Sequence, residues 1–263
     1  CYDLLTEEPK DFLTPDNSYT SKAGFESALG NVYKDIRNHF YAESDAIDNY
    51  ALLAGTDIDL YMKHWNKGGP YFEYYYWNQL NGDNGMSKTW WQRFYSYIFS
   101  CNAIIERADA DAAHWNSEAD KNAIVGEAKF LRAFAYMRLN ILYKGVPLYM
   151  NAITSPENGN KARSSEADVW AAVLQDLTDC VNEPNLPGKY NSGDSNYGRV
   201  TKGAAYALRG QVYMWQKNWE AAVDDFNSVA DCGFGLYTKA GATSYKQLLK
   251  IANEQCEEMI FSV

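Results

Sequence analysis

The stretch that decides the fold of this chain reads Glu127-Ala-Lys-Phe-Leu-Arg-Ala-Phe-Ala-Tyr-Met-Arg-Leu-Asn-Ile-Leu-Tyr143, and Lys144-Gly-Val-Pro-Leu148 follows it. Apolar side chains occupy nearly every position, and Arg138 lies about 180° around a helix from Lys129 at roughly 100° per residue. A helix that is apolar on nearly all sides is sandwiched between other helices. Because glycine and proline end helices, the stretch predicts one long buried helix that stops near Tyr143.

Composition places the chain among ordinary globular proteins. With 263 residues, of which 46% are hydrophobic and 22% charged, it can bury a substantial core as one large domain or two smaller ones. The formal net charge is -10, and the basic residues are scattered among more numerous acids. This argues against nucleic acid as a partner, because affinity for phosphate backbones comes mainly from clustered Lys and Arg.

The remaining chain shows helical periodicity and no alternation of strands with helices, which predicts an all-α fold. We expect a lead over residues 1–20 and a helical domain over residues 21–263. The expected helices cover residues 21–39, 88–109, 117–143, 165–180, 201–216, 219–231 and 244–252.

Two of these helices match a tetratricopeptide repeat. With Gly210 at position eight of the roughly 34-residue repeat, Tyr213 falls at position eleven, Ala222 at twenty and Phe226 at twenty-four. Gly203 and Gly210 lie on one helix face and leave room for the following helix to pack closely. The pattern predicts stacked helical hairpins, an architecture that usually serves binding.

The connections indicate which helices pair. The turn Lys217-Asn218 is short, so the helices on either side run antiparallel as a hairpin over residues 201–231. The same argument pairs the long helix with the one after it, across a longer connection that contains proline and glycine. We therefore expect a second, degenerate hairpin over residues 117–182.

The cysteines fall into two groups. Cys101, Cys180, Cys232 and Cys256 have no CxxC or CxxH spacing, so neither zinc nor another metal is expected, and no cofactor motif is present. We interpret them as free thiols, with a disulfide left open if the chain is extracytoplasmic. Cys1 is different, because bacterial lipoproteins begin at a cysteine that carries the lipid, and we expect it to be lipidated.

Several segments resemble one known family. The long helix is nearly identical to a hallmark segment of the SusD/RagB family, lipid-anchored nutrient-binding proteins of Bacteroidetes outer membranes. Four further segments are similar to motifs of that family: Trp91-Gln-Arg-Phe-Tyr95 with Asn102-Ala-Ile-Ile-Glu106, Arg163-Ser-Ser-Glu-Ala-Asp-Val-Trp170, Gly198-Arg-Val-Thr-Lys-Gly-Ala-Ala-Tyr-Ala-Leu208, and Asn218-Trp-Glu-Ala-Ala222.

The resemblance implies a fold, a location and a partner. It implies a SusD-like α/α superhelix on the cell surface, anchored in the outer membrane by lipid on Cys1. It implies that the protein captures oligosaccharide, or in some members peptide, for a SusC-like TonB-dependent transporter, and that it is not an enzyme. Family members are about twice this length, so the resemblance implies an N-terminal half. Trp91 and Tyr95 match the family's core helix and are assigned structural roles, while Trp90 is left open.

The aromatic residues suggest where a sugar would bind. The chain has 21 Tyr and 8 Trp, concentrated between Tyr61 and Tyr97, and Gly and Pro within this region predict loops over residues 61–87. A sugar site combines a flat aromatic platform with side chains that bond hydroxyl groups. The candidates are Trp65, Tyr75 and Trp77 for the platform and Asn78, Asn81 and Asp83 for hydrogen bonds.

Other interpretations stay open. The same rings could pack beneath a second half of the protein or beneath the transporter, and the repeats could form a scaffold that binds only peptides or proteins. A glycan-cleaving enzyme is the weakest alternative, because the histidines are isolated and no HExxH, GxSxG or phosphate-loop motif occurs. The pair Asp57 and Asp59 is best explained as solvated loop acids, or at most as an adventitious calcium site.

Overall fold

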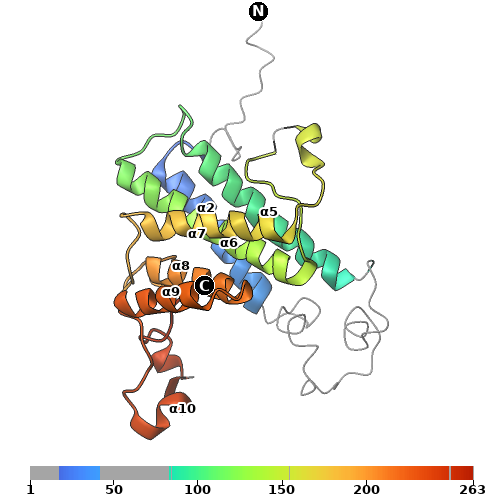
Figure 1. Ribbon diagram of the computed structural model, residues 1–263. Coiled ribbons are helices and arrows are strands. Elements are labelled where there is room, and N and C mark those ends of the chain that lie inside the picture. The colour runs from blue at the N-terminus through green and yellow to red at the C-terminus, as the bar shows by residue number, and fades with distance from the viewer. Residues whose placement is uncertain (1–17, 42–82, 84, 154, 249, 263) are drawn as a thin grey trace, which may run out of the picture.

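A computed structural model describes residues 18–41, 83, 85–153, 155–248 and 250–262 of the chain. Within these residues the fold is all-α, as the sequence predicts, and β structure is confined to an isolated bridge between Ser21 and His114. The helices form an array in which successive helices lie side by side (Figure 1). The α-helices are α2 (Lys22–Tyr41), α5 (Gly85–Arg107), α6 (Glu118–Tyr143), α7 (Glu166–Asn182), α8 (Lys202–Trp215), α9 (Trp219–Asp231) and α10 (Ser244–Leu248).

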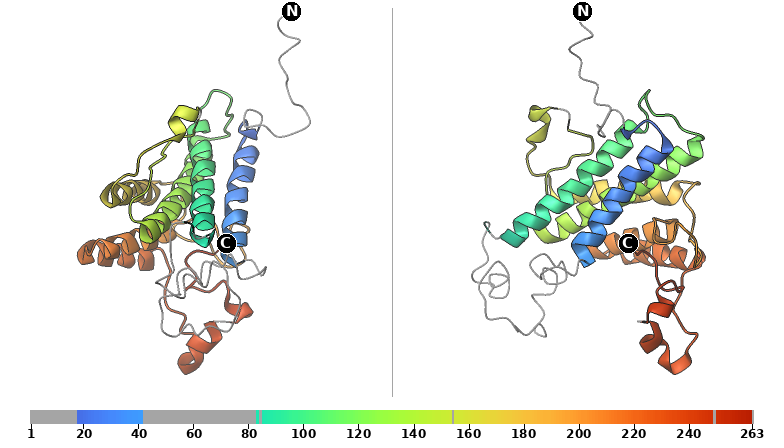
Figure 2. Two further views of the ribbon diagram at one scale, coloured as in Figure 1. Left: turned by 90° about the vertical axis from the view of Figure 1, so that its right-hand side faces the viewer. Right: turned by 180° about the vertical axis from the view of Figure 1, so that it is seen from behind.

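Helix α6 is the predicted long buried helix and lies at the centre of the array. It packs against α5 and α7, and α2 lies on the side of α6 opposite α7 (Figure 2). Phe130, Leu131, Tyr136 and Leu139 are all at most 2% exposed. Since burying a large apolar side chain stabilises the fold by about 1.5–3 kcal/mol, these neighbours on opposite sides explain why nearly every position of α6 is apolar.

The C-terminal end of α6 is closed by glycine and arginine. Gly145 has a φ of +64°, and a Cβ atom there would lie 2.6 Å from the carbonyl oxygen of Ser164, so glycine is required for both reasons. The Arg163 guanidinium donates hydrogen bonds to the carbonyl oxygens of Tyr143, Lys144 and Gly145. These carbonyls lack partners within the helix, and the cation also suits the negative end of the helix dipole.

The later helices begin at side-chain caps. Ser165 accepts a hydrogen bond from the Asp168 amide, and the Asp168 carboxylate accepts one from the Ser165 amide, which completes a capping box at α7. Thr201 accepts from the Ala204 amide at α8, and Asn218 caps α9. Each cap is worth about 1 kcal/mol.

Helices α8 and α9 form the predicted hairpin. A Cβ atom on Gly210 would lie 2.7 Å from the Phe226 ring, so glycine allows the close approach that the repeat pattern predicts. Arg209 and Asp225 join the two helices through a pair of hydrogen bonds of 2.8 and 2.7 Å. Gly203 differs from expectation, because it faces Phe234, which follows α9, rather than α9 itself.

Two element boundaries differ from the sequence expectation by three residues or more. Helix α5 begins at Gly85, so it includes residues 85–87 of the expected loop region. The helix expected over residues 244–252 is shorter, since α10 ends at Leu248 and Lys250 takes an extended backbone with φ -88° and ψ 144°. The chain then returns to the core, where the Phe261 ring lies 5.1 Å from that of Phe130.

A buried ion pair joins α6 to α7. Arg132 and Asp176 side chains are 5% and 4% exposed, and two hydrogen bonds of 2.8 and 2.7 Å connect them. Arg132 also donates to the Asn102 side chain and to the Met150 carbonyl. Burial raises the pKa of Asp176, and the hydrogen bonds from Arg132 oppose this rise. One guanidinium therefore connects three helices and the segment after α6.

Replacing Asp176 by Leu leaves the Arg132 cation buried without its carboxylate. We expect the free energy of unfolding to fall by about 3–5 kcal/mol, measured by urea denaturation. Asp179→Leu is the matched control, because Asp179 pairs with Lys129 between the same two helices but is 35% exposed, and this change should cost about 1 kcal/mol or less. Equal losses for the two variants would contradict a special role for the buried pair.

Candidate functional site: an aromatic groove on α5

Most residues of the predicted sugar site lie outside the described part of the chain. These are Trp65, Tyr75, Trp77, Asn78 and Asn81, together with the lipidation residue Cys1. Asp83 is described and is exposed in a turn immediately before α5. The site prediction therefore stays a prediction. The structure adds a description of α5, the helix that directly follows these residues.

A groove of about 480 Å³ runs along α5 beyond Asp83. Helix α5 forms one wall, and the segment that follows α6 forms the other; Figure 1 shows this segment beside α5. Aromatic rings supply the floor, and serine and glutamine side chains supply polar groups. The lining residues are Trp91, Gln92, Tyr95, Ser96, Phe99, Ser100, Pro147 and Tyr149.

The rings form a continuous ladder because of their spacing in the sequence. Trp91, Tyr95 and Phe99 are four residues apart and share one face of α5. Ring centroids lie 5.0 Å apart for Trp91 and Tyr95 and 5.8 Å apart for Tyr95 and Phe99. Tyr149 meets both Tyr95 and Phe99 edge to face. Phe99 is 37% exposed, which leaves ring surface open to a ligand.

Hydrogen bonds fix the second wall of the groove. The Tyr95 hydroxyl donates to the Pro147 carbonyl at 2.7 Å. Asn102 donates to the Tyr149 carbonyl at 2.7 Å, and the Tyr136 hydroxyl both donates to that carbonyl and accepts from the Tyr149 amide. The stretch over residues 147–151, which forms neither helix nor strand, is thus held in place before any ligand arrives, and this lowers the entropic cost of binding.

The groove lining carries no formal charge. Burial raises the pKa of Tyr95 and of Tyr136 well above that of free tyrosine, so both stay neutral hydrogen-bonding groups at physiological pH. Lys161 lies at the rim, with its ammonium group 5.3 Å from the centre of the Tyr149 ring and donating to the Leu148 carbonyl. The groove can therefore bind a ligand by ring stacking and by hydrogen bonds from uncharged side chains.

The tryptophans of α5 have different roles. Trp90, left open from sequence, is completely buried against the Phe40 and Phe94 rings. Tyr95 is also buried and fits the structural role assigned to it. Trp91 was assigned a structural role as well, yet it is half-buried and also lines the groove. The spacing of aromatic residues on α5 was visible in the sequence, whereas the approach of Pro147 and Tyr149 was not.

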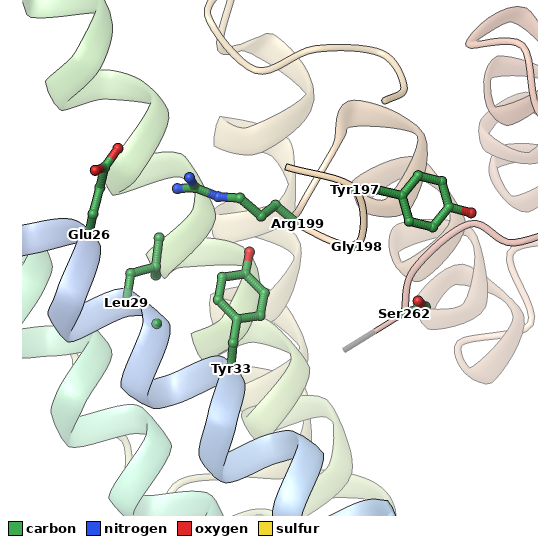
Figure 3. A pocket seen from close by; sticks show the side chains of 8 residues that line it. Glu26, Leu29, Tyr33, Tyr197, Gly198, Arg199 and Ser262 are labelled. Atoms are coloured by element: carbon green, nitrogen blue, oxygen red, sulfur yellow. The ribbon is translucent and has the colours of Figure 1, made fainter. Parts of the chain in front are cut away.

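A second pocket, of about 300 Å³, lies between α2 and the turn before α8 (Figure 3). The Glu127 carboxylate accepts from Tyr33 at 2.6 Å and from Arg199 at 2.7 and 3.1 Å. Burial raises the pKa of Glu127, and Arg199 counteracts the rise. In Figure 3, Tyr197 points away from Arg199. Because the charged groups already satisfy one another, we assign this cluster a structural role.

The described residues were also compared with the requirements of metal sites and reactive thiols. Across them, no group of three or more His, Cys, Asp and Glu side chains is placed to hold a metal ion. Cys101, Cys180, Cys232 and Cys256 are free, and all but Cys232 are buried. Burial raises the pKa of the Cys101 thiol to about 12, which keeps it protonated and unreactive. None of the described helices is long and apolar enough to cross a membrane.

The sequence of the chain matches a family profile over residues 11–214. That family, SusD-like, is described as starch-binding and associating with the outer membrane. The chain belongs to the SusD-like family. The resemblance read from the motifs is therefore confirmed, and with it the all-α SusD-like fold.

Individual relatives agree with this assignment. The chain is 25% identical over 228 residues to SusD-like protein P25 of Formosa agariphila, a match covering 85% of this chain and 42% of the relative. It is 24% identical over 267 residues to a SusD-like protein of Bacteroides ovatus, covering 99% and 46%. The chain thus spans about half the length of these SusD-like relatives.

Solved structures show the same fold. A SusD-like protein from Bacteroides fragilis superposes with a TM-score of 0.75 at 25% identity, covering 98% of this chain and 47% of that one. A laminarin-binding SusD-like protein gives a TM-score of 0.75 at 23% identity, covering 92% and 51%. At these coverages the whole array described above corresponds to about half of each SusD-like structure.

The hydrogen bond from Tyr95 to Pro147 can be tested by removing one oxygen. Tyr95→Phe keeps the ring ladder but leaves the half-buried Pro147 carbonyl without this donor, so we expect unfolding in urea to require about 1 kcal/mol less free energy. Tyr245→Phe removes a hydroxyl from a side chain that is 81% exposed and should change stability by less than about 0.5 kcal/mol. No difference between the two variants would mean that the groove wall is held by other contacts.

Proposed function

We propose that this chain is a cell-surface glycan-binding lipoprotein that captures oligosaccharide and delivers it to a SusC-like TonB-dependent outer-membrane transporter. The observation that carries the proposal is the aromatic groove on α5 within a SusD-like fold. The family description names starch binding and association with the outer membrane, and one structural neighbour is described as laminarin-binding. These descriptions agree with the chemistry of the groove.

Sugar rings suit this groove because they have two kinds of surface. Their C–H faces pack on aromatic rings, and their hydroxyl edges need donors and acceptors. Trp91 and Phe99 offer exposed ring surface, and Gln92, Ser96 and Ser100 offer hydrogen bonds. The uncharged lining favours neutral glycans, since a sulfate or carboxylate group would lose water inside the groove without gaining a cation there. The Lys161 ammonium group lies at the rim and already donates to the Leu148 carbonyl.

The predicted loop residues extend this site in our proposal. Trp65, Tyr75 and Trp77 would provide further platforms, and Asn78, Asn81 and Asp83 further hydrogen bonds. They precede α5 in the sequence, and Asp83 lies in the turn that leads into the helix bearing Trp91. One longer glycan would then contact both groups of residues.

The groove is proposed to hold glycan without cleaving it. Glycoside hydrolysis needs two carboxyl groups on either side of the scissile bond, and none of the groove residues is an acid. A peptide- or protein-binding scaffold of the same uptake system is the second candidate, because stacked helical hairpins commonly bind proteins. Binding experiments with both classes of ligand separate the two candidates.

Exposed rings in the groove should contribute directly to glycan affinity. We expect Phe99→Ser and Trp91→Ala each to weaken binding of laminarin or starch oligosaccharides by about fivefold, since one stacking ring contributes about 1 kcal/mol. Isothermal titration calorimetry provides the measurement. The matched control is Trp219→Ala, which removes an exposed Trp from α9 and should leave the affinity unchanged.

Three outcomes would count against this site. Affinity retained in both groove variants but lost in Trp65→Ala and Trp77→Ala would confine the site to the predicted loops. Tighter binding of a sulfated glycan than of its neutral parent would contradict the neutral class. Binding of peptides with no affinity for any polysaccharide would support the scaffold instead.

Membrane attachment and transporter delivery can be tested together. In cells fed a radiolabelled fatty acid, we expect the secreted chain to incorporate label and Cys1→Ser to abolish it, because the thioether requires the thiol. We also expect a TonB-dependent transporter to copurify with the labelled protein from outer membranes. Label retained in the Cys1→Ser protein, or purification without any transporter, would reject the corresponding part of the proposal.

A further inference from the structure

The lining of the groove on α5 repeats every four residues. Each aromatic ring that α5 contributes is followed directly along the chain by a side chain that can form hydrogen bonds. The three pairs are Trp91-Gln92, Tyr95-Ser96 and Phe99-Ser100. Because four residues make slightly more than one helical turn, the polar side chains form a row of their own beside the ring ladder. The groove therefore consists of three similar steps rather than a single pocket.

The helix sets the length and the direction of these steps. Four residues advance about 6 Å along an α-helix, so the two steps from Trp91 to Phe99 advance about 12 Å. Successive ring centroids lie 5.0 and 5.8 Å apart. The ladder is inclined by about 26° to the axis of α5, because residues four apart follow a ridge of the helix surface. Each step is thus close in length to one pyranose unit of an oligosaccharide.

The polar row is available to a ligand. Gln92 and Ser96 are exposed, and Ser100 is half-buried. Within the described part of the chain, no hydrogen bond occupies these three side chains. An amide and two hydroxyl groups can each donate and accept, which matches the hydroxyl groups along the edge of a sugar chain.

The middle step differs from the two outer steps. Trp91 is half-buried and Phe99 is 37% exposed, whereas Tyr95 is only 6% exposed, with its ring packed edge to face against Tyr149. A ligand can therefore stack on the two outer rings, while at the middle step it meets the Ser96 hydroxyl. One small sugar cannot reach both outer rings, because the covered ring lies between them.

We infer that the groove binds a linear run of about three sugar units, one for each helical step of about 6 Å. The outer units stack on Trp91 and Phe99, and the middle unit is hydrogen-bonded to Ser96. This inference rests on the proposed function and adds the length and the orientation of the bound segment, which follows the ring ladder across α5. A disaccharide reaches only one of the two open rings at a time.

Oligosaccharides of increasing length test the inference. The probes are glucose and the malto-, laminari-, cello- and manno-oligosaccharides from the disaccharide to the hexasaccharide, titrated into the full chain by isothermal titration calorimetry. In a series that binds, we expect the affinity to rise by about fivefold from the disaccharide to the trisaccharide, because the third unit adds a second stacked ring. Phe99→Ser should remove this rise.

Variants of the two open rings distinguish a ligand that spans them from one that uses either end. With the trisaccharide, Trp91→Ala and Phe99→Ser should each weaken binding about fivefold, and the losses of free energy should add in the double variant. With the disaccharide, each single change should weaken binding by about twofold at most, because the ligand loses only half of its possible positions. The double variant should weaken disaccharide binding further, because neither open ring remains.

A bulky side chain at the middle step should block the path. We expect Ser96→Phe to weaken trisaccharide binding by at least about tenfold, because the new ring lies where the middle unit would pass. Ser27→Phe is the matched control, since it makes the same change at another exposed helical serine, on α2, and should leave the affinity unchanged. Both variants should keep the wild-type circular dichroism spectrum, because both positions are exposed.

The outcomes separate this inference from the proposed function. Equal affinity for the disaccharide and the trisaccharide, or equal effects of the ring variants on both, would overturn the three-unit segment and leave glycan capture in place. Unchanged trisaccharide binding in Ser96→Phe would do the same. Binding of peptides without affinity for any of the four glycan series would reject the proposed function, and this inference with it.

Discussion

The bidentate pair between Arg132 and Asp176 is the contact on which the rest of the array depends. It is buried between α6 and α7, and the same guanidinium holds Asn102 of α5 and the Met150 carbonyl. An arginine in an apolar core is costly unless every donor is used. The Arg132 guanidinium therefore fixes the positions of three helices and one connecting segment relative to one another. Apolar side chains then fill the space between these helices.

The second wall of the groove on α5 is held by the same hydrogen-bond network. Asn102 accepts from Arg132 and donates to the Tyr149 carbonyl, so the wall that carries Tyr149 is tied to the same network as the core. The groove wall opposite α5 needs no strand or helix, because buried polar groups hold its backbone. The shape of the groove and the stability of the fold consequently depend on the same contacts.

The helices could be predicted well because their signals are local. Apolar residues throughout α6, the Ser165 cap and Gly210 opposite Phe226 each act within one helix or between neighbouring helices. The groove could be predicted in part, since Trp91, Tyr95 and Phe99 share a helix face. The contacts of Tyr95 and Phe99 with Tyr149 span 54 and 50 residues and depend on backbone hydrogen bonds, so they could not be predicted. The exposure of Trp219 and Val223 on α9 was also not predicted, because apolar spacing alone does not show whether another element covers a helix face.

The segment between α6 and α7 has anchors near both of its ends. Arg163 fastens one end to the carbonyls of Tyr143, the last residue of α6, and of the two residues after it. Asn102 fastens the other end at Tyr149 and Asn151. Between them, Ile153 and Asn158 are exposed to solvent. Evolution can lengthen or shorten this intervening stretch without disturbing the core, so under the proposed function the rim of the groove can diversify in ligand preference while the scaffold stays the same.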